Sequence, residues 1–117
     1  MVITSVEEAL EAVEQDGLNL RFVPKEFQTE EICIIAVKNH HLGLQFVENQ
    51  TEKVCLEAVK RNGYVIRYVE NQTEEMCLEA VKQNESLLKF IKQQTPKIIQ
   101  TALLKNPEAF KYVKPWQ

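Results

Sequence analysis

The chain repeats itself every 22 residues. Residues 48–62 read ENQTEKVCLEAVKRN, and residues 70–84 read ENQTEEMCLEAVKQN, which is almost the same segment. Fainter copies flank this pair, because Ser5 begins an earlier copy and threonines recur at the same interval, at Thr29, Thr51, Thr73 and Thr95. A period of this length is typical of stacked supersecondary units, each too small to bury its own apolar face. The repeat therefore constrains the fold more than any other feature.

Five units align on a column of alanines. The first interval is 24 residues and the other three are 22, and the two extra residues fall within 23–27, so the first connection is longer. The alanines are Ala12, Ala36, Ala58, Ala80 and Ala102. The units then span about 5–28, 29–50, 51–72, 73–94 and 95–117, and at 117 residues we expect a single domain over 1–117.

The first half of each unit predicts an α-helix. The leading Ser or Thr is a preferred N-cap, glutamates in the first turn suit the helix dipole, and Pro96 follows Thr95 at the N1 position. Apolar residues then recur at i, i+1, i+4 and i+5, which gives a wide apolar face suited to burial between two neighbours. Asp16-Gly17, Asn62-Gly63 and Asn84 are expected to end these helices as C-cap signals.

The second half of each unit is harder to assign. LNLRFV, LGLQFV and YVIRYV are rich in residues that favour strands, which would make a leucine-rich-repeat-like fold. Asn106-Pro107 instead reads as an N-cap followed by an N1 proline. Apolar pairs at i, i+3 recur in every unit, at Leu20/Val23, Leu44/Val47, Ile66/Val69, Leu88/Ile91 and Phe110/Val113. We therefore predict a second, shorter helix, and residues 64–69 test this choice directly.

Together these patterns predict an all-α, solenoid-like array of about five short helical hairpins. Neighbouring units complete the core, and the terminal units act as caps. Trp116 is expected to fold over the last exposed face.

Charge and hydropathy restrict the classes of partner. A net charge of −3 argues against nucleic-acid binding by broad phosphate neutralisation. MVITSVEEALEAV has no basic leader, and the longest apolar run, residues 32–37, is too short to span a bilayer. We expect a cytoplasmic protein with no membrane partner, whose cysteines stay reduced.

Cys33, Cys55 and Cys77 occupy one position in successive units. Packed helices lie about 8–10 Å apart, whereas a disulfide needs Cα atoms within about 7 Å. We interpret the three cysteines as buried core residues rather than metal ligands or disulfide partners.

His40 and His41 are adjacent in the sequence, and no Cys, Asp or Glu stands beside them at a spacing typical of metal ligands. They take the places of Asn62 and Gly63 in the next unit, which predicts helix capping. No catalytic constellation or glycine-rich phosphate loop stands out, so no catalytic, cofactor-binding or metal-binding residue is predicted.

Two columns follow the second helices. The aromatic column is interpreted as core: Phe22, Phe46, Tyr68, Phe90 and Tyr112. The neighbouring residues are expected to form a solvent-facing stripe, a candidate partner surface because repeat proteins bind along such continuous faces: Arg21, Gln45, Arg67, Lys89 and Lys111. Ile35 replaces the glutamate that its neighbours carry on a predicted polar face, and is a further candidate contact.

The units resemble a known family. Cys-Leu-Glu-Ala-Val-Lys at 55–60 and again at 77–82, followed by an aromatic-Val pair, is similar to the repeats called domain of unknown function 4116. The likeness covers nearly the whole chain and is weaker at its ends, where Leu103-Leu104 and Pro107 depart from the pattern. The resemblance implies tandem α-helical repeats, often within longer proteins. It implies no activity and no catalytic residues.

The sequence favours a non-catalytic protein-interaction module or scaffold, with a protein partner of unknown identity and self-association left open. One alternative is an acidic inhibitor that blocks a basic site on a partner through exposed glutamates, whose affinity would fall with salt: Glu52, Glu57, Glu74 and Glu79. Another is nucleic-acid binding along the Arg/Lys stripe. That requires aromatic rings exposed beside the charges, whereas the aromatic column is expected to be buried.

Overall fold

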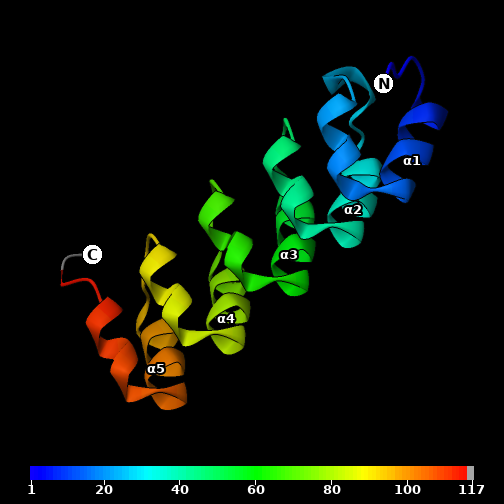
Figure 1. The fold of residues 1–117 in the computed structure, drawn as a ribbon. Coiled ribbons are helices and arrows are strands. Elements are labelled where there is room, and N and C mark those ends of the chain that lie inside the picture. The colour runs from blue at the N-terminus through cyan, green and yellow to red at the C-terminus, as the bar shows by residue number, and fades with distance from the viewer. Residues whose placement is uncertain (116–117) are drawn as a thin grey trace.

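The computed structural model describes residues 1–115, and these form helices and no strand (Figure 1). Each unit begins with an α-helix of 10 residues: α1 (Val6–Gln15), α2 (Glu30–Asn39), α3 (Glu52–Arg61), α4 (Glu74–Gln83) and α5 (Pro96–Lys105). A 3-10 helix of six residues follows in each: η1 (Gly17–Phe22), η3 (His41–Phe46), η4 (Gly63–Tyr68), η5 (Glu85–Phe90) and η6 (Pro107–Tyr112). The longer first connection holds an additional turn, η2 (Lys25–Phe27).

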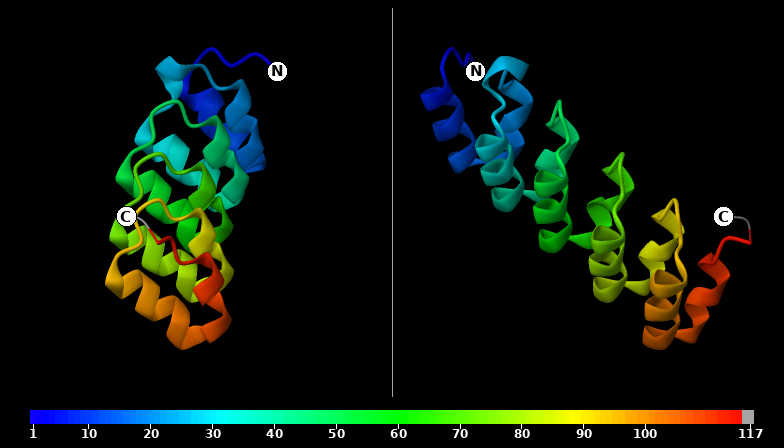
Figure 2. Two further views of the ribbon diagram at one scale, coloured as in Figure 1. Left: turned by 90° about the vertical axis from the view of Figure 1, so that its left-hand side faces the viewer. Right: turned by 180° about the vertical axis from the view of Figure 1, so that it is seen from behind.

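The units stack in chain order, so the all-α, solenoid-like prediction is confirmed. Successive α-helices pack side by side in one layer, and successive 3-10 helices pack in a second layer (Figures 1 and 2). The result is an elongated body of 50 × 22 × 17 Å with the two chain ends at opposite ends of the array. The loops between units lie along one edge, and the tight turns within units lie along the other (Figure 2).

The predicted N-caps are present in all five α-helices. The Thr51 hydroxyl accepts a hydrogen bond from the Val54 N–H at 3.3 Å, and Ser5 accepts from the Glu8 N–H at 3.1 Å. Each bond satisfies one of the free N–H groups that every helix start leaves. The equivalent hydroxyls of Thr29, Thr73 and Thr95 do the same.

The second helix of each unit is confirmed, and residues 64–68 are helical, which excludes the strand alternative there. The helix is of the 3-10 type. One residue with an extended backbone separates this 3-10 helix from the preceding α-helix. The backbone N–H of that residue donates the last hydrogen bond of the α-helix, to the carbonyl oxygen of the alanine in the alanine column. The side chain of that same residue accepts a hydrogen bond from the N–H two residues on, and these dual caps are Asp16, His40, Asn62, Asn84 and Asn106.

The helices therefore end at the predicted residues but not by the expected glycine mechanism. No described residue has a positive φ. Gly17 is needed instead for close packing, since a Cβ there would lie 2.1 Å from the Ala36 carbonyl oxygen of the next unit. A Cβ at Gly63 would likewise lie 3.0 Å from the Ala80 Cα.

The core runs the length of the array through the alanine column and its apolar neighbours. Ala36, Ala58, Ala80 and Ala102 are fully buried, and Ala12 is nearly so. Ile35, predicted on a polar face, is half-buried and packs against this core. Its position faces the preceding unit: one unit later the same position is Glu57, whose carboxylate lies 4.0 Å from the Lys38 ammonium. The prediction of Ile35 as a solvent-facing residue is therefore wrong.

A column of glutamines connects consecutive units through main-chain atoms. Gln72 Nε2 donates to the carbonyl oxygens of Ile66 and Phe90, each at 3.0 Å, and its Oε1 accepts from the Lys92 N–H at 2.9 Å. One side chain thus joins the ends of two successive 3-10 helices. Gln28, Gln50 and Gln94 bridge their neighbouring units in the same way, and we call this set the glutamine column.

Candidate functional site

The residues predicted to form a solvent stripe are all exposed, on one 3-10 helix after another: Arg21, Gln45, Arg67, Lys89 and Lys111. They come into line because the 3-10 helices pack in order and each contributes the residue before its aromatic position. The sequence therefore placed these side chains in solvent correctly. Whether they contact a partner stays a prediction.

The aromatic column lies at the margin of the core, so its assignment to the core holds only in part. Phe22 is 38% exposed, and the other four rings (Phe46, Tyr68, Phe90 and Tyr112) are partly exposed while packing against the core. The reason is that the rings lie at the outer margin of the 3-10 layer, where a neighbouring unit covers one side of each ring but not all of it.

Cations of the stripe stack on these rings. The Arg67 guanidinium carbon lies 5.0 Å from the Phe90 ring centre and 5.4 Å from that of Tyr68, so it bridges two units. Lys89 similarly lies 5.3 Å from Phe90 and 5.6 Å from Tyr112. Such contacts contribute roughly 0.5–1 kcal/mol at exposed sites. We call the ten residues of the two columns the cation–aromatic stripe.

Tyr64 extends this surface at its centre. Its ring is 41% exposed and packs edge-on against Phe90 with centres 5.8 Å apart, and the Arg67 guanidinium donates to its hydroxyl. Amphipathic rings beside Arg are the side chains enriched at protein interfaces. Tyr64 was not predicted as a surface residue, because it begins the segment YVIRYV, which was considered only for its secondary structure.

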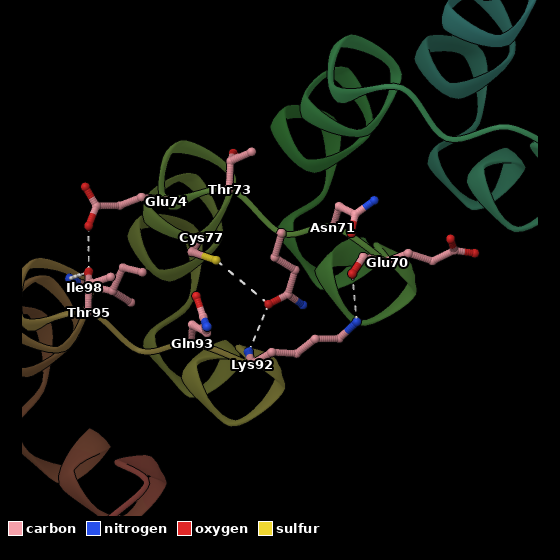
Figure 3. Close-up of a pocket in the computed structure, with 10 residues that line it drawn as sticks. Glu70, Asn71, Thr73, Glu74, Cys77, Lys92, Gln93, Thr95 and Ile98 are labelled. Carbon is pink, nitrogen blue, oxygen red and sulfur yellow. Dashed lines mark hydrogen bonds between the residues drawn. The ribbon is translucent and has the colours of Figure 1, made fainter. Parts of the chain in front are cut away.

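A cavity of about 490 Å³ lies at the loop edge and is lined by residues of units 3, 4 and 5 (Figure 3). Several of the lining residues bond one another. The Glu74 carboxylate accepts from the Thr95 hydroxyl at 2.6 Å, and the Lys92 ammonium donates to the Glu70 carbonyl at 2.9 Å. Gln72, which also lines the cavity, bonds the Phe90 carbonyl and the Lys92 N–H and so joins two loops. The cavity is thus a gap between loops that are bonded to each other.

The three cysteines are free and buried, which confirms the core assignment. Burial, with a smaller contribution from Glu30, Glu70 or Glu74, raises the pKa of each thiol to about 11. Each Sγ lies 3.6–3.9 Å from the Oε1 of the preceding glutamine in the column. A thiol of this kind stays protonated near neutral pH and is a poor nucleophile or metal ligand.

Of the histidine pair, His40 caps helices as predicted, whereas His41 is the first residue of η3. His40 Nδ1 accepts from the Leu42 N–H at 3.3 Å, and the Asn62 side-chain amide lies 3.3 Å from His41 Nε2. Burial, followed by the neighbouring His40, lowers the pKa of His41. Within residues 1–115 no group of three or more His, Cys, Asp or Glu side chains is arranged to hold a metal ion.

The four glutamates of the acidic alternative do not form one exposed patch. Glu52 and Glu74 are exposed in the first turns of α3 and α4, whereas Glu57 and Glu79 are half-buried where their helices face the preceding units. Only two of the four side chains are therefore freely presented, and Glu74 is already bonded to Thr95.

The family resemblance is confirmed over the first part of the chain. Residues 7–51 match the family model for DUF4116, a domain of unknown function. This match covers α1, α2 and the 3-10 helices between and after them. No curated protein and no solved structure matches the chain. The DUF4116 repeat brings no activity with it, so functional inference depends on the surface of the array. None of the helices in the described part is long and apolar enough to cross a membrane.

Proposed function

We propose that this protein is a non-catalytic interaction module that binds a protein partner along the cation–aromatic stripe. One observation supports this above all others: partly exposed rings lie beside exposed polar side chains on five successive units, and four of these polar side chains are cations. Extended binding faces of stacked repeats are built in this way.

The chemistry of the stripe favours a partner segment that is extended and carries both carboxylates and apolar side chains. The stripe presents four cations and one glutamine, while its rings offer apolar area between them. Carboxylates of the partner would replace water around Arg67 and Lys89, and its apolar side chains would cover the rings beside them. Charge complementarity of this kind increases the association rate and selects against basic partners. The free, protonated thiols suit a reducing compartment, so we place this activity in the cytoplasm.

The test compares proteins captured by three versions of the chain. Arg67→Glu with Lys89→Glu reverses the centre of the stripe, whereas Lys53→Glu with Lys82→Glu makes the same charge change on exposed positions of α3 and α4. We expect a bound protein that the stripe variant loses and the control variant retains. A captured protein that both variants hold equally would contradict binding through the stripe.

A second candidate, binding of single-stranded nucleic acid, is favoured by the same exposure of the rings. Bases stack on aromatic side chains and phosphates pair with Arg and Lys, and the sequence argument against this class assumed buried rings. Fluorescence anisotropy with a labelled oligothymidine at low salt separates the two candidates. Binding that is lost with Arg67→Glu would favour nucleic acid. No binding at low salt would leave the protein partner as the proposal.

A further inference from the structure

Unit 5 exposes a residue whose equivalents in the preceding units are buried in the core. In the preceding units the first residue of the i, i+3 pair is fully buried, as in Leu20, Leu44, Ile66 and Leu88. In η6 the same position is Phe110, which is 72% exposed. Leu104 of α5 is 79% exposed and takes the place of the lysines of the inner helices. The array therefore ends in an apolar face, here called the tail face, centred on Phe110 and Leu104.

The first unit ends in a different face. Inner helices contact the preceding unit through a buried apolar residue, such as Ile32 in α2 or Met76 in α4, and α1 carries Glu8 at this position. The N-terminal residues lie against α1 and leave a hollow of about 220 Å³, lined by Met1, Val2, Ile3 and Ala12 and bordered by Glu8 and Glu11. Met1 and Val2 remain 65% and 81% exposed. We call this the head face.

The two faces carry opposite charge. Six acidic and two basic residues give unit 1 a net charge of −4, whereas one acidic and four basic residues give unit 5 a net charge of +3. Lys97 of α5 is exposed two turns before Leu104 on the same side of the helix, opposite in sign to Glu8 and Glu11 at the head. Tail-to-tail contact would bring two positive units together, and head-to-head contact would bring two strongly negative ones together. Only head-to-tail contact pairs opposite charges.

The same polarity already operates inside the array. Across the boundary between units 2 and 3, the Lys38 ammonium lies 4.0 Å from the Glu57 carboxylate of the following unit. At this boundary a basic residue near the end of one helix therefore meets an acidic residue of the next unit.

We propose that the tail face binds the head face of a second copy of this chain, with Phe110 and Leu104 seated against the hollow beneath Met1 and Val2. This contact is heterologous, so a bound pair still has one free head face and one free tail face. Further copies can therefore add, either as an open chain or as a ring, and assembly does not stop at a dimer. The proposal goes beyond the proposed function, because the cation–aromatic stripe runs along the side of the array and need not be covered.

Sedimentation velocity on the untagged 117-residue chain tests the contact. We expect the weight-average mass to rise with concentration past that of a dimer, and to fall at high salt because screening weakens the charge pairing. A chain that is monomeric at every concentration and low salt has its tail face covered within one molecule, and this would overturn the proposal. A mass that levels off at a dimer would overturn it too.

Two blocked variants give the decisive comparison. Phe110→Glu blocks the tail, and Glu8→Lys with Glu11→Lys blocks the head; all three positions are exposed, so the fold should be kept, which circular dichroism checks. Each variant alone should associate about tenfold more weakly or not at all. Mixed in equal amounts, they should form a one-to-one complex that stops there, because only one intact head and one intact tail meet.

The outcomes separate the possible geometries. A head-blocked variant that still forms dimers by itself would show tail-to-tail contact, and a mixture that stays monomeric would show that the two faces do not fit; either result overturns the proposal. Lys53→Glu in the middle of the array is the matched charge control and should assemble as the unaltered chain does. If it loses assembly as well, general charge rather than the two faces controls association, and the proposal fails.

Discussion

In unit 1, the helix α1 turns Glu8 and Glu11 outward at positions that inner helices use to contact the preceding unit. In unit 5, Phe110 remains exposed at a position that is fully buried in the other units, and Leu104 is exposed where the inner helices carry lysines. Both units have the same two helices and the same caps. The comparison shows that burial in this array is decided by the neighbouring unit, whereas helix formation is decided within each unit.

The largest effect on the free energy of unfolding should come from truncating Leu88, and truncation of its equivalent in unit 5, Phe110, gives the comparison. Leu88→Ala removes a fully buried side chain and should lower the free energy of unfolding by about 2–5 kcal/mol. Phe110→Ala, one unit later, should change it by no more than about 0.5 kcal/mol because the ring is exposed. Urea unfolding followed by circular dichroism, at concentrations low enough to keep the chain monomeric, measures both. Equal costs would show that the tail face is covered in solution.

The glutamine column sharpens the comparison between inner and terminal helices. Gln28 and Gln94 make matching sets of three bonds to main-chain atoms. Replacing either by alanine should cost about 1–3 kcal/mol, since buried main-chain groups lose their partners. Amide hydrogen exchange should speed up more in η6 after Gln94→Ala than in η3 after Gln28→Ala, because η3 packs between η1 and η4 whereas η6 packs against η5. The reverse order would contradict this account of the column.

Helix caps should be insensitive to position along the array. Ser5→Ala and Thr51→Ala each remove one hydroxyl that accepts from the first turn, and each should cost about 1 kcal/mol. Thr51→Ser should keep most of the stability, which identifies the hydroxyl as the cause. A much smaller loss at Ser5, measured in the same urea series, would show that the first helix is already frayed in solution.

A pH dependence should arise from the inner units. The raised pKa of about 11 means that the three cysteine thiols bind protons more tightly in the folded state than in the unfolded state. Their contribution is complete below about pH 9 and is lost as pH rises towards 11. The equivalent residues of the outer units are Ala9 and Ile99, so urea unfolding at pH 8 and pH 10 should differ less in a variant with all three cysteines changed to alanine. If the difference in stability between pH 8 and pH 10 is unchanged in this variant, titratable groups other than the cysteines cause it.

Features that depend on one unit could be predicted from the sequence. The 22-residue period, the hydroxyl caps, the start and end of each α-helix and the buried cysteines all follow from local pattern. The type of the second helix could not be predicted, because apolar pairs at i, i+3 suit both α and 3-10 geometry. The glutamine column had a visible signal, since Gln-Thr recurs at every boundary after the first unit, but only the threonine was used.

Features that depend on neighbours were predicted less well. Ile35 was assigned to solvent because the other units carry a charge there, yet that position faces the preceding unit. The aromatic rings were assigned to the core because their type suggests burial, and the layer of 3-10 helices covers them only in part. Trp116, expected to cover the last face, lies outside the described residues. In a repeat protein, alignment of the units shows which residues are equivalent, but it does not show how much of each side chain the neighbouring units bury.

The glutamine column also bears on how such a chain changes in length over evolution. Its principal bonds are to main-chain N–H and C=O groups, which every neighbouring unit supplies whatever its side chains are. A junction of this kind does not require coordinated substitutions in the two units it joins. Duplication or loss of a whole 22-residue segment would therefore recreate a working junction at once, and the near-identity of residues 48–62 and 70–84 has the form that such an event leaves behind.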